Sequence, residues 1–280
     1  MSDILLIHGG AGSDSSYVPR LDKYCHLSFK GTALDMVVNS VVMMEDDPVF
    51  NAGTGSVKRI DGSIQMDAAL MEDGKIGSVA TIEKVKNPIL VAKMVMTKTP
   101  HVMLSGDGAT SFARRMGFPE YDPSTERTEE IWRKTVAFFK GEKVDLPPRY
   151  EEYRKFQNMF SPNKDTVGAV ARVGGKFAAA VSTGGSSPMM RGRIGDSPLP
   201  GAGLYAGSKG AVVATGIGEE IVRKMLSYRI YEKIGSGSLK SIVKDIVGEF
   251  GDILVGVIAV SEKEQFSMAN SNMATYCVEK

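Results

Sequence analysis

The sequence Thr166-Val-Gly-Ala-Val-Ala-Arg-Val-Gly-Gly-Lys-Phe-Ala-Ala-Ala-Val-Ser-Thr183 predicts two apolar strands joined by a tight turn. Gly-Gly between two such runs is a hairpin signal, because glycine readily adopts the positive φ angles that tight turns require. A charged stretch precedes the hairpin, contains Pro147-Pro148 and ends at Asp165. We therefore expect an ordered hairpin that starts at Thr166, and a connector over about 140–165 before it.

Strands and helices follow one another on both sides of this hairpin without repeated βαβ units. Asn87 before Pro88 is expected to cap the helix that follows. The order favours an α+β fold with two packed, mostly antiparallel sheets covered by helices. Residues 13–30 show no regular pattern. The first expected strand is Leu5–His8. The other expected strands cover 56–60, 63–71, 76–85, 101–105, 211–215 and a closing hairpin at 253–270. The expected helices cover 32–44, 88–98, 109–116, 129–139, 219–234 and 238–249.

The composition of the 280 residues is that of a globular protein with a full core, at 42% hydrophobic and 24% charged residues. A net charge of +1 argues against a nucleic-acid binder. The longest apolar runs, such as Ile4–Ile7 and Ile253–Val260, are strand-sized, so we expect no membrane span. Cys25 and Cys277 lie far apart and form neither a disulfide framework nor a zinc spacing. With no basic leader at the start, these features favour a reduced, cytoplasmic setting.

Several common catalytic patterns are missing from the sequence. The sequence has three histidines but no HExxH motif, which argues against a zinc hydrolase. It also contains neither the GxSxG motif of a serine hydrolase nor a GxxxxGK[ST] phosphate-binding loop. Thr215-Gly-Ile-Gly218 comes closest to a dinucleotide fingerprint but lacks the third glycine and the βαβ context. A nucleotide-binding or purely structural protein remains an alternative from another class. Backbone amides at that position would equally suit a developing negative charge.

The segment 183–207 is rich in glycine and small polar residues. Ordering such a loop costs entropy, which proteins tolerate where a ligand must meet backbone. Arg193 and Asp196, three residues apart, could hold opposite ends of a zwitterion, with the guanidinium on a carboxylate and the carboxylate on an ammonium. The ordinary alternative is a surface salt bridge within a turn.

Thr166 has an ordinary interpretation as the first residue of a strand. Its position directly after a connector rich in charged residues and proline suggests a second interpretation, in which Thr166 is a catalytic nucleophile. If the chain were cut before it, Thr166 would carry an α-amine with a pKa of about 7.7–8.0, which makes that amine a usable base near neutrality. Threonine with its own terminal amine is one of the recognised activated nucleophiles.

Motifs along nearly the whole chain resemble the plant-type L-asparaginase/isoaspartyl peptidase family, a branch of the N-terminal nucleophile hydrolases. The likeness weakens over residues 13–30 and 120–164. It rests on His8-Gly-Gly-Ala-Gly12, Phe50-Asn-Ala-Gly-Thr-Gly-Ser56, Met66-Asp-Ala68, Thr166-Val-Gly-Ala-Val-Ala171, Ser182-Thr-Gly-Gly185, Gly192-Arg-Ile-Gly-Asp-Ser-Pro198, Gly201-Ala-Gly-Leu-Tyr-Ala206 and Thr215-Gly-Ile-Gly-Glu219.

This resemblance implies a four-layer αββα sandwich and a single domain, 1–280. By the same likeness, the precursor cleaves itself between Asp165 and Thr166 into an α part, 1–165, and a β part, 166–280. Two such αβ units would form a dimer. The implied reaction is hydrolysis of L-asparagine to L-aspartate and ammonia, or of β-aspartyl dipeptides.

The resemblance also implies roles for the site residues. Thr166 Oγ would attack the substrate's side-chain carbonyl, and the Thr215 hydroxyl with the Gly216 N–H would form the oxyanion hole. Thr183 would hydrogen-bond around Thr166, and Asn51 would lie near its amine.

Substrate recognition would follow the same likeness. Arg193 would bind the α-carboxylate, while Asp196 and the Gly218 carbonyl would bind the α-ammonium. No cofactor is required, but a structural sodium ion is implied. Its ligands would be main-chain carbonyls of Met44, Glu45, Asp47, Phe50, Ala52 and Thr54.

Two departures from the family pattern bear on specificity and processing. The family often has a lysine where this chain has Pro188-Met189-Met190, so substrate preference could differ there. The connector is also short.

The nearest alternative functions are a glycosylasparaginase and a threonine endopeptidase. A secreted glycosylasparaginase should carry a signal peptide and more cysteines, and an endopeptidase needs a site open at both ends.

Overall fold

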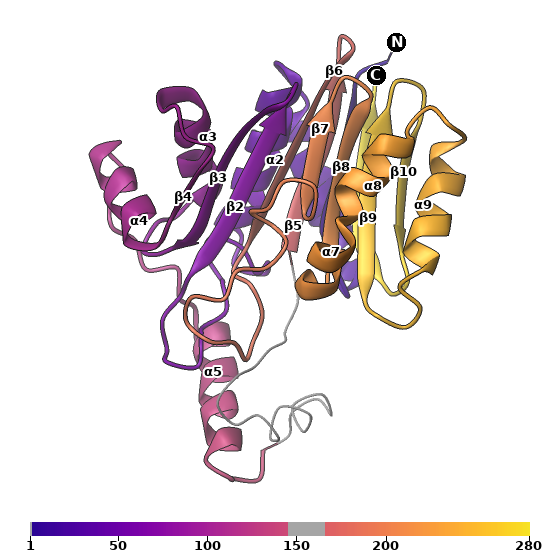
Figure 1. Ribbon diagram of the computed structural model, residues 1–280. Helices are drawn as coiled ribbons and strands as arrows, with labels where there is room; N and C mark the ends of the chain where they lie inside the picture. Colours follow the sequence, from indigo (N-terminus) through magenta and orange to yellow (C-terminus); the bar gives the residue numbers. More distant parts are fainter. Residues whose placement is uncertain (1, 145–165) are drawn as a thin grey trace.

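The protein contains two β-sheets with helices packed on them (Figure 1). The structure is a computed structural model that describes residues 2–144 and 166–280. Most of the predicted connector and the predicted cleavage position at Asp165 lie outside the described residues. The seven-stranded sheet has the order β11-β1-β5-β6-β2-β3-β4. Its strands are β1 (Ile4–Ala11), β2 (Met66–Glu72), β3 (Lys75–Ile82), β4 (Met103–Ser105), β5 (Thr166–Val173), β6 (Lys176–Thr183) and β11 (Met273–Glu279).

The second sheet has four strands in the order β10-β9-β8-β7. They are β7 (Leu204–Gly207), β8 (Gly210–Gly216), β9 (Val255–Ser261) and β10 (Gln265–Ala269). Neighbouring strands run antiparallel in both sheets, except for the parallel pair β3–β4. The predicted α+β class with two mostly antiparallel sheets is confirmed.

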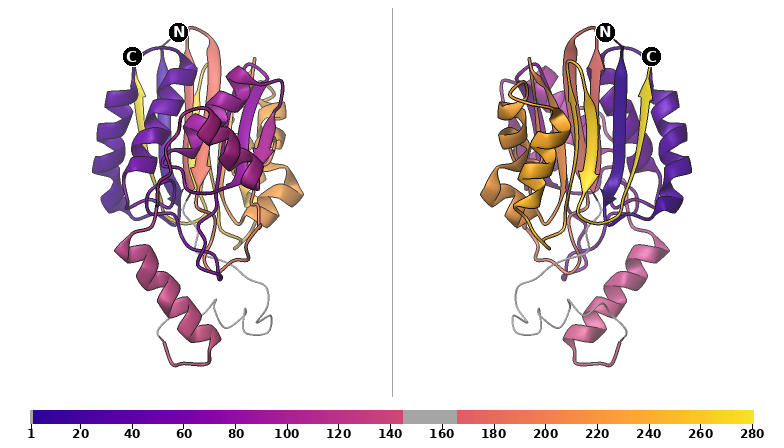
Figure 2. Two further views of the ribbon diagram at one scale, coloured as in Figure 1. Left: turned by 90° about the vertical axis from the view of Figure 1, so that its left-hand side faces the viewer. Right: turned by 90° about the vertical axis from the view of Figure 1, so that its right-hand side faces the viewer.

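The helices divide between the two sheets (Figures 1 and 2). Those before the connector are α1 (Val18–Ser28), preceded by a single 3-10 turn (Ser15–Tyr17), α2 (Ala33–Asp46), α3 (Pro88–Lys98), α4 (Gly106–Arg115) and α5 (Glu126–Phe139). Those after it are α7 (Gly218–Lys224), α8 (Leu226–Lys233) and α9 (Leu239–Gly248). In both figures α5 extends away from the sheets.

Three apolar clusters hold these elements together. One lies between α1–α4 and the seven-stranded sheet, and another between α7–α9 and the four-stranded sheet. The third joins the two sheets, with Val170 of β5 and Val213 of β8 among its members. Burial of this much apolar surface is the main force that stabilises the fold. Both strands of the predicted hairpin therefore lie at the centre of the molecule.

Three sequence predictions about secondary structure were wrong, and two strands were missed. Residues 13–30, predicted to be irregular, contain α1, whose one buried side combines apolar Leu21 and Cys25 with Ser28. The predicted strand at 56–60 is absent, because Arg59 N–H bonds the carbonyl of Ser63 within a turn. Strands β7 and β11 were not predicted at all. The predicted helix at 219–234 is two helices, separated at Met225 with φ 48°.

The expected capping of α3 takes a different form. Asn87 occupies the N-cap position, but its side-chain amide donates to Asp46 and makes no capping bond. Instead, Oε1 of the buried Glu45 accepts the N–H of Ile89 at 3.0 Å and the hydroxyl of Ser182 at 2.6 Å. A carboxyl from α2 thus ties α3 to the end of β6.

Candidate active site

A small pocket lies where β5 begins and β6 and β8 end, near the loop 185–197. Five of the residues singled out from the sequence line it, although they come from distant parts of the chain: Thr166, Thr183, Arg193, Asp196 and Gly216. Thr215 is the last but one residue of β8, and Gly218 is the first residue of α7. The lining residues are Thr166, Thr183, Gly185, Ser186, Arg193, Gly195, Asp196, Ser197 and Gly216.

Thr166 is the first residue of β5 and lies opposite Thr183, the last residue of β6. Its Oγ1 donates a hydrogen bond of 3.2 Å to Thr183 Oγ1. The same oxygen of Thr183 accepts the N–H of Gly185 at 2.9 Å. The prediction that Thr183 hydrogen-bonds Thr166 agrees with this geometry, and the hairpin register explains it.

Asn51 holds the backbone that follows Thr183. Its Nδ2 donates to Gly185 O at 2.8 Å, its Oδ1 accepts Val57 N–H at 2.9 Å, and its own carbonyl accepts Gly184 N–H at 2.8 Å. A Cβ at Gly184 would lie 2.4 Å from Asn51 Oδ1, so only glycine fits there. Within the described part of the chain, none of these bonds reaches Thr166. The geometry therefore places Asn51 as a support for the Thr183–Gly185 turn.

Thr215 and Gly216 end strand β8 beside the pocket. The Thr215 hydroxyl oxygen accepts the N–H of Ala11 at 3.2 Å, so its own proton stays available for donation. Gly216 has φ 137°, and a Cβ there would lie 2.3 Å from the Leu254 carbonyl oxygen. Glycine is required at this position for both reasons. Gly216 lines the pocket, whereas Thr215 is buried behind it.

Arg193 forms an ion pair that the sequence interpretation missed. Its Nε donates to Glu219 Oε1 at 3.0 Å and its Nη2 donates to Glu219 Oε2 at 2.9 Å. The alternative of a surface salt bridge between Arg193 and Asp196 is wrong, because Arg193 pairs with Glu219 and Asp196 is buried. Glu219 directly follows Thr215-Gly-Ile-Gly218, and this position beside the motif was the only sequence feature that pointed to a role for Glu219 in the site.

Asp196 is buried, and its Oδ2 has no hydrogen-bond partner among the described residues. Burial raises the pKa of this carboxyl to about 7. A Cβ at Gly218 would lie 2.8 Å from Asp196 Oδ1 and 3.0 Å from Arg193 Nη2. The absence of a side chain at Gly218 thus lets a carboxyl and a guanidinium share one side of the pocket.

Comparison with known proteins decides the family of this chain. A family model described as asparaginase matches residues 1–279. The chain belongs to this asparaginase family. The predicted membership is therefore confirmed, and with it the expectation of a hydrolase.

Relatives within the asparaginase family carry three kinds of name. A plant-type L-asparaginase of Pyrococcus abyssi is 37% identical over 95% of this chain and 92% of its own length. An isoaspartyl peptidase/L-asparaginase of Rattus norvegicus is 39% identical over 81% of this chain and 69% of its own length. An N(4)-(β-N-acetylglucosaminyl)-L-asparaginase of Elizabethkingia miricola is 37% identical over 90% of this chain and 73% of its own length.

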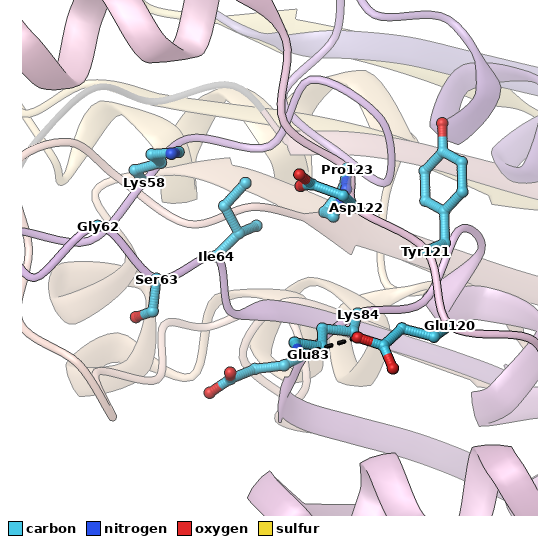
Figure 3. Close-up of a pocket in the computed structure, with 10 residues that line it drawn as sticks. All are labelled: Lys58, Gly62, Ser63, Ile64, Glu83, Lys84, Glu120, Tyr121, Asp122 and Pro123. Carbon is cyan, nitrogen blue, oxygen red and sulfur yellow. Dashed lines mark hydrogen bonds and ion pairs between the residues drawn. The ribbon is translucent and has the colours of Figure 1, made fainter.

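A second and larger pocket, of about 440 Å³, has a different set of lining residues (Figure 3). It lies between residues 58–64, 83–84 and 120–123. Its lining mixes lysine and carboxylate side chains, and Lys84 pairs with Glu120 at 2.8 Å. None of the site residues that were identified from the sequence lines it. The smaller pocket that contains Thr166 is therefore the candidate active site of this family member.

Side-chain metal chemistry has no support in the part of the chain that the structure describes. No group of three or more His, Cys, Asp and Glu residues there could hold a metal ion. The described helices also include none that is long and apolar enough to cross a membrane. The expected sodium site uses main-chain carbonyls instead of side chains.

Proposed function

We propose that this member of the asparaginase family is a self-cleaving amidohydrolase with Thr166 as its nucleophile. Its substrates are L-asparagine, hydrolysed to L-aspartate and ammonia, and β-aspartyl dipeptides. One observation carries the proposal: Thr166 lines the same pocket as the partly buried guanidinium of Arg193 and the buried carboxyl of Asp196. This set matches an aspartyl group with a free α-carboxylate and α-ammonium.

The first chemical step is release of Thr166. Its Oγ attacks the Asp165 carbonyl carbon, the peptide C–N bond breaks, and water hydrolyses the resulting ester to leave Thr166 with a free α-amine. The hydrogen bond of 3.2 Å to Thr183 fixes the direction of the hydroxyl. In its neutral form the new amine accepts the hydroxyl proton in each later turnover.

Turnover then proceeds as acyl transfer. Thr166 Oγ attacks the side-chain carbonyl of the substrate, and the negative charge that develops on that oxygen is stabilised by the Thr215 hydroxyl and the Gly216 N–H. The amine returns the proton to the leaving nitrogen, so that ammonia or an amino acid departs. Water then hydrolyses the ester of Thr166 and releases L-aspartate.

Substrate binding precedes these steps. Arg193 binds the α-carboxylate, and Asp196 with the Gly218 carbonyl binds the α-ammonium. The orphaned Oδ2 of Asp196 supports this role, because a buried carboxylate oxygen without a partner favours an incoming cation. Asn51 acts through the turn that it supports at Gly184 and Gly185.

A sodium ion in the 44–54 loop is also part of the proposal. Met44 and Glu45 belong to the last turn of α2, where carbonyls lack helical partners and the helix dipole is negative. Oxygen donors suit a monovalent cation. The carbonyls of Glu45, Asp47 and Phe50 already accept N–H groups of Thr54, Phe50 and Arg127, and each would have to use its second lone pair for the ion. The ligands would be the main-chain carbonyls of Met44, Glu45, Asp47, Phe50, Ala52 and Thr54. When bound, the ion would supply rigidity to the loop that carries Asn51, without taking part in the chemistry.

The remaining proposals concern architecture and setting. We propose the four-layer αββα sandwich of N-terminal nucleophile hydrolases, a dimer of αβ units and a cytoplasmic location. Two sheets that share one apolar cluster support the first of these. Cys25 and Cys277 are both free thiols, which agrees with a reduced compartment.

Steady-state kinetics of the processed protein test the substrate proposal. L-asparagine, several β-aspartyl dipeptides and an N4-glycosylated asparagine should be compared, because one relative is named for the last substrate. We expect turnover of at least one of the first two, and none with Thr166→Ala. Turnover of the glycosylated substrate alone would show that the substrate assignment is wrong.

A further inference from the structure

The guanidinium of Arg193 has two edges that can bind a carboxylate. The Nε/Nη2 edge is taken by Glu219, through bonds of 3.0 and 2.9 Å. The Nη1/Nη2 edge lies against Gly195 and Gly218, since Cβ atoms there would lie 2.7 Å from Nη1 and 3.0 Å from Nη2. Both glycines leave room for the guanidinium, and Arg193 lines the pocket. The ion pair with Glu219 therefore leaves one bidentate edge of Arg193 for a ligand.

Asp196 lies close to this guanidinium without pairing to it. Asp196 Oδ1 and Arg193 Nη2 both lie near the position that a Cβ of Gly218 would occupy, yet Arg193 forms its ion pair with Glu219. The Oδ2 of Asp196 is buried and has no partner among the described residues. A buried carboxylate and a nearby guanidinium attract each other strongly in a medium of low dielectric constant. Another group must therefore hold Arg193 away from Asp196.

Other acidic groups do not fill this role. Asp67 is also buried and its charge acts on Arg193, but its Oδ1 accepts the N–H of Thr81 at 2.7 Å and it forms no ion pair with Arg193 among the described residues. Glu219, by contrast, contacts Arg193 with both oxygens. The side chain of Glu219 is 43% exposed and that of Arg193 only 17%, so the carboxylate reaches inward from the rim.

We propose that Glu219 is a positioning residue for recognition of the aspartyl group. It holds the Nε/Nη2 edge of Arg193, presents the Nη1/Nη2 edge to the substrate α-carboxylate, and keeps Arg193 from pairing with Asp196. Asp196 thereby stays free for the α-ammonium. This inference rests on the proposed function, because it assigns the other end of the same substrate contact.

Two variants separate charge from hydrogen bonding. Glu219→Ala removes both contacts, so Arg193 should turn toward Asp196 and close the binding site. We expect KM for L-asparagine to rise roughly tenfold or more, since hydrogen bonds to charged groups contribute at that scale, with kcat nearly unchanged. Glu219→Gln keeps one acceptor for Arg193 and should recover part of the loss. The inhibition constant of L-aspartate should rise in parallel, because it reports binding without chemistry.

The neighbouring residue supplies a matched control. Glu220 lies on the same helix turn and pairs with Arg223, whose side chain is exposed. Glu220→Gln removes the same charge one residue away, and we expect wild-type KM and wild-type inhibition by L-aspartate. A rise in KM with Glu220→Gln equal to that with Glu219→Gln would overturn the inference, because loss of charge alone would explain it.

Failure of the inference can be told apart from failure of the proposed function. If Arg193→Ala loses L-asparagine binding while Glu219→Ala keeps wild-type KM and wild-type inhibition, only the role of Glu219 is wrong. If Arg193→Ala also binds normally, the substrate contact itself is wrong. A fall in kcat at unchanged KM with Glu219→Ala would equally contradict positioning through Arg193.

Discussion

The hydroxyl of Thr166 donates a hydrogen bond of 3.2 Å to the hydroxyl of Thr183, directly opposite it in the β5–β6 pair. Sheet register therefore sets the direction of the proposed nucleophile. Thr183 is held in turn by the N–H of Gly185, whose carbonyl accepts from Asn51. A chain of short contacts thus links the loop around Asn51 to the oxygen that attacks.

Arg193→Ala tests the substrate contact. The variant loses a charge-assisted, bidentate interaction in a mostly buried position, so kcat/KM for L-asparagine should fall roughly 10- to 100-fold, mainly through KM. Self-cleavage should continue, because it involves no free substrate. Steady-state kinetics on the processed variant provide the measurement. Wild-type kcat/KM would refute the assignment.

The pH dependence should distinguish binding from chemistry. Burial raises the pKa of Asp196 to about 7, and only its ionised form can bind the α-ammonium. The amine of Thr166 must also be neutral, with an ordinary pKa of about 7.7–8.0. Both ionisations act in the free enzyme, so log kcat/KM should fall toward low pH with a slope near two, while log kcat falls with a slope near one. Equal slopes would rule out one of the two groups.

Asn51→Asp should disturb the turn beside Thr183. The carboxylate keeps the shape of the side chain but replaces the Nδ2 donor with an oxygen that faces the Gly185 carbonyl. Because small displacements of reacting groups are costly, kcat should fall by about 10²-fold. Self-cleavage should slow as well. Circular dichroism would verify the fold, and an unchanged kcat in a folded variant would show that the turn needs no such support.

His8 should make stability depend on pH. It is buried, its Nδ1 accepts the N–H of Gly10 at 2.9 Å, and burial lowers its pKa to about 3. Between pH about 6.5 and about 3 the unfolded chain takes up a proton that the folded protein does not, so the free energy of unfolding falls by about 1.4 kcal/mol per pH unit. His8→Asn keeps an acceptor for Gly10 and should remove this contribution.

Unfolding by urea at about pH 7 and about pH 5 measures the effect of His8. The loss of stability on acidification should be smaller in His8→Asn than in the wild type. His101→Asn, at an exposed position, is the control and should behave like the wild type. An identical pH dependence for His8→Asn and the wild type would mean that His8 is protonated in the folded protein.

Local patterns in the sequence predicted the parts of the fold that local chemistry decides. The hairpin from Thr166 to Thr183 shows its apolar runs and glycine turn directly, and the apolar residues at helical spacing over 32–44 predicted α2. The glycine-rich loop 183–207 was expected to bring backbone close to a ligand. At Gly184, Gly216 and Gly218 the groups that approach closely are those of the protein itself, from Asn51, Leu254 and Asp196.

Features that depend on distant partners were missed or misassigned. β11 consists of mixed residues with little apolar alternation and is a strand because it pairs with β1 from the other end of the chain. The carboxyl of Glu45 accepts the N–H of Ile89 at the start of α3. The two residues are 44 apart in the sequence, so no local pattern could predict this contact. Glu219 is 26 residues from Arg193, and only folding brings the two together.

The mass of the purified protein tests the central claim most directly. Dividing 30.1 kDa in proportion to 165 and 115 of 280 residues gives fragments of about 17.7 and 12.4 kDa. The account predicts both fragments without added protease, with Thr166 as the first residue of the smaller. It also predicts an intact, inactive Thr166→Ala, and a slowly cleaved Thr166→Ser that retains some activity, since serine keeps the oxygen but loses the methyl that restricts χ1. A wild-type protein that hydrolyses L-asparagine while its mass stays at 30.1 kDa would contradict it.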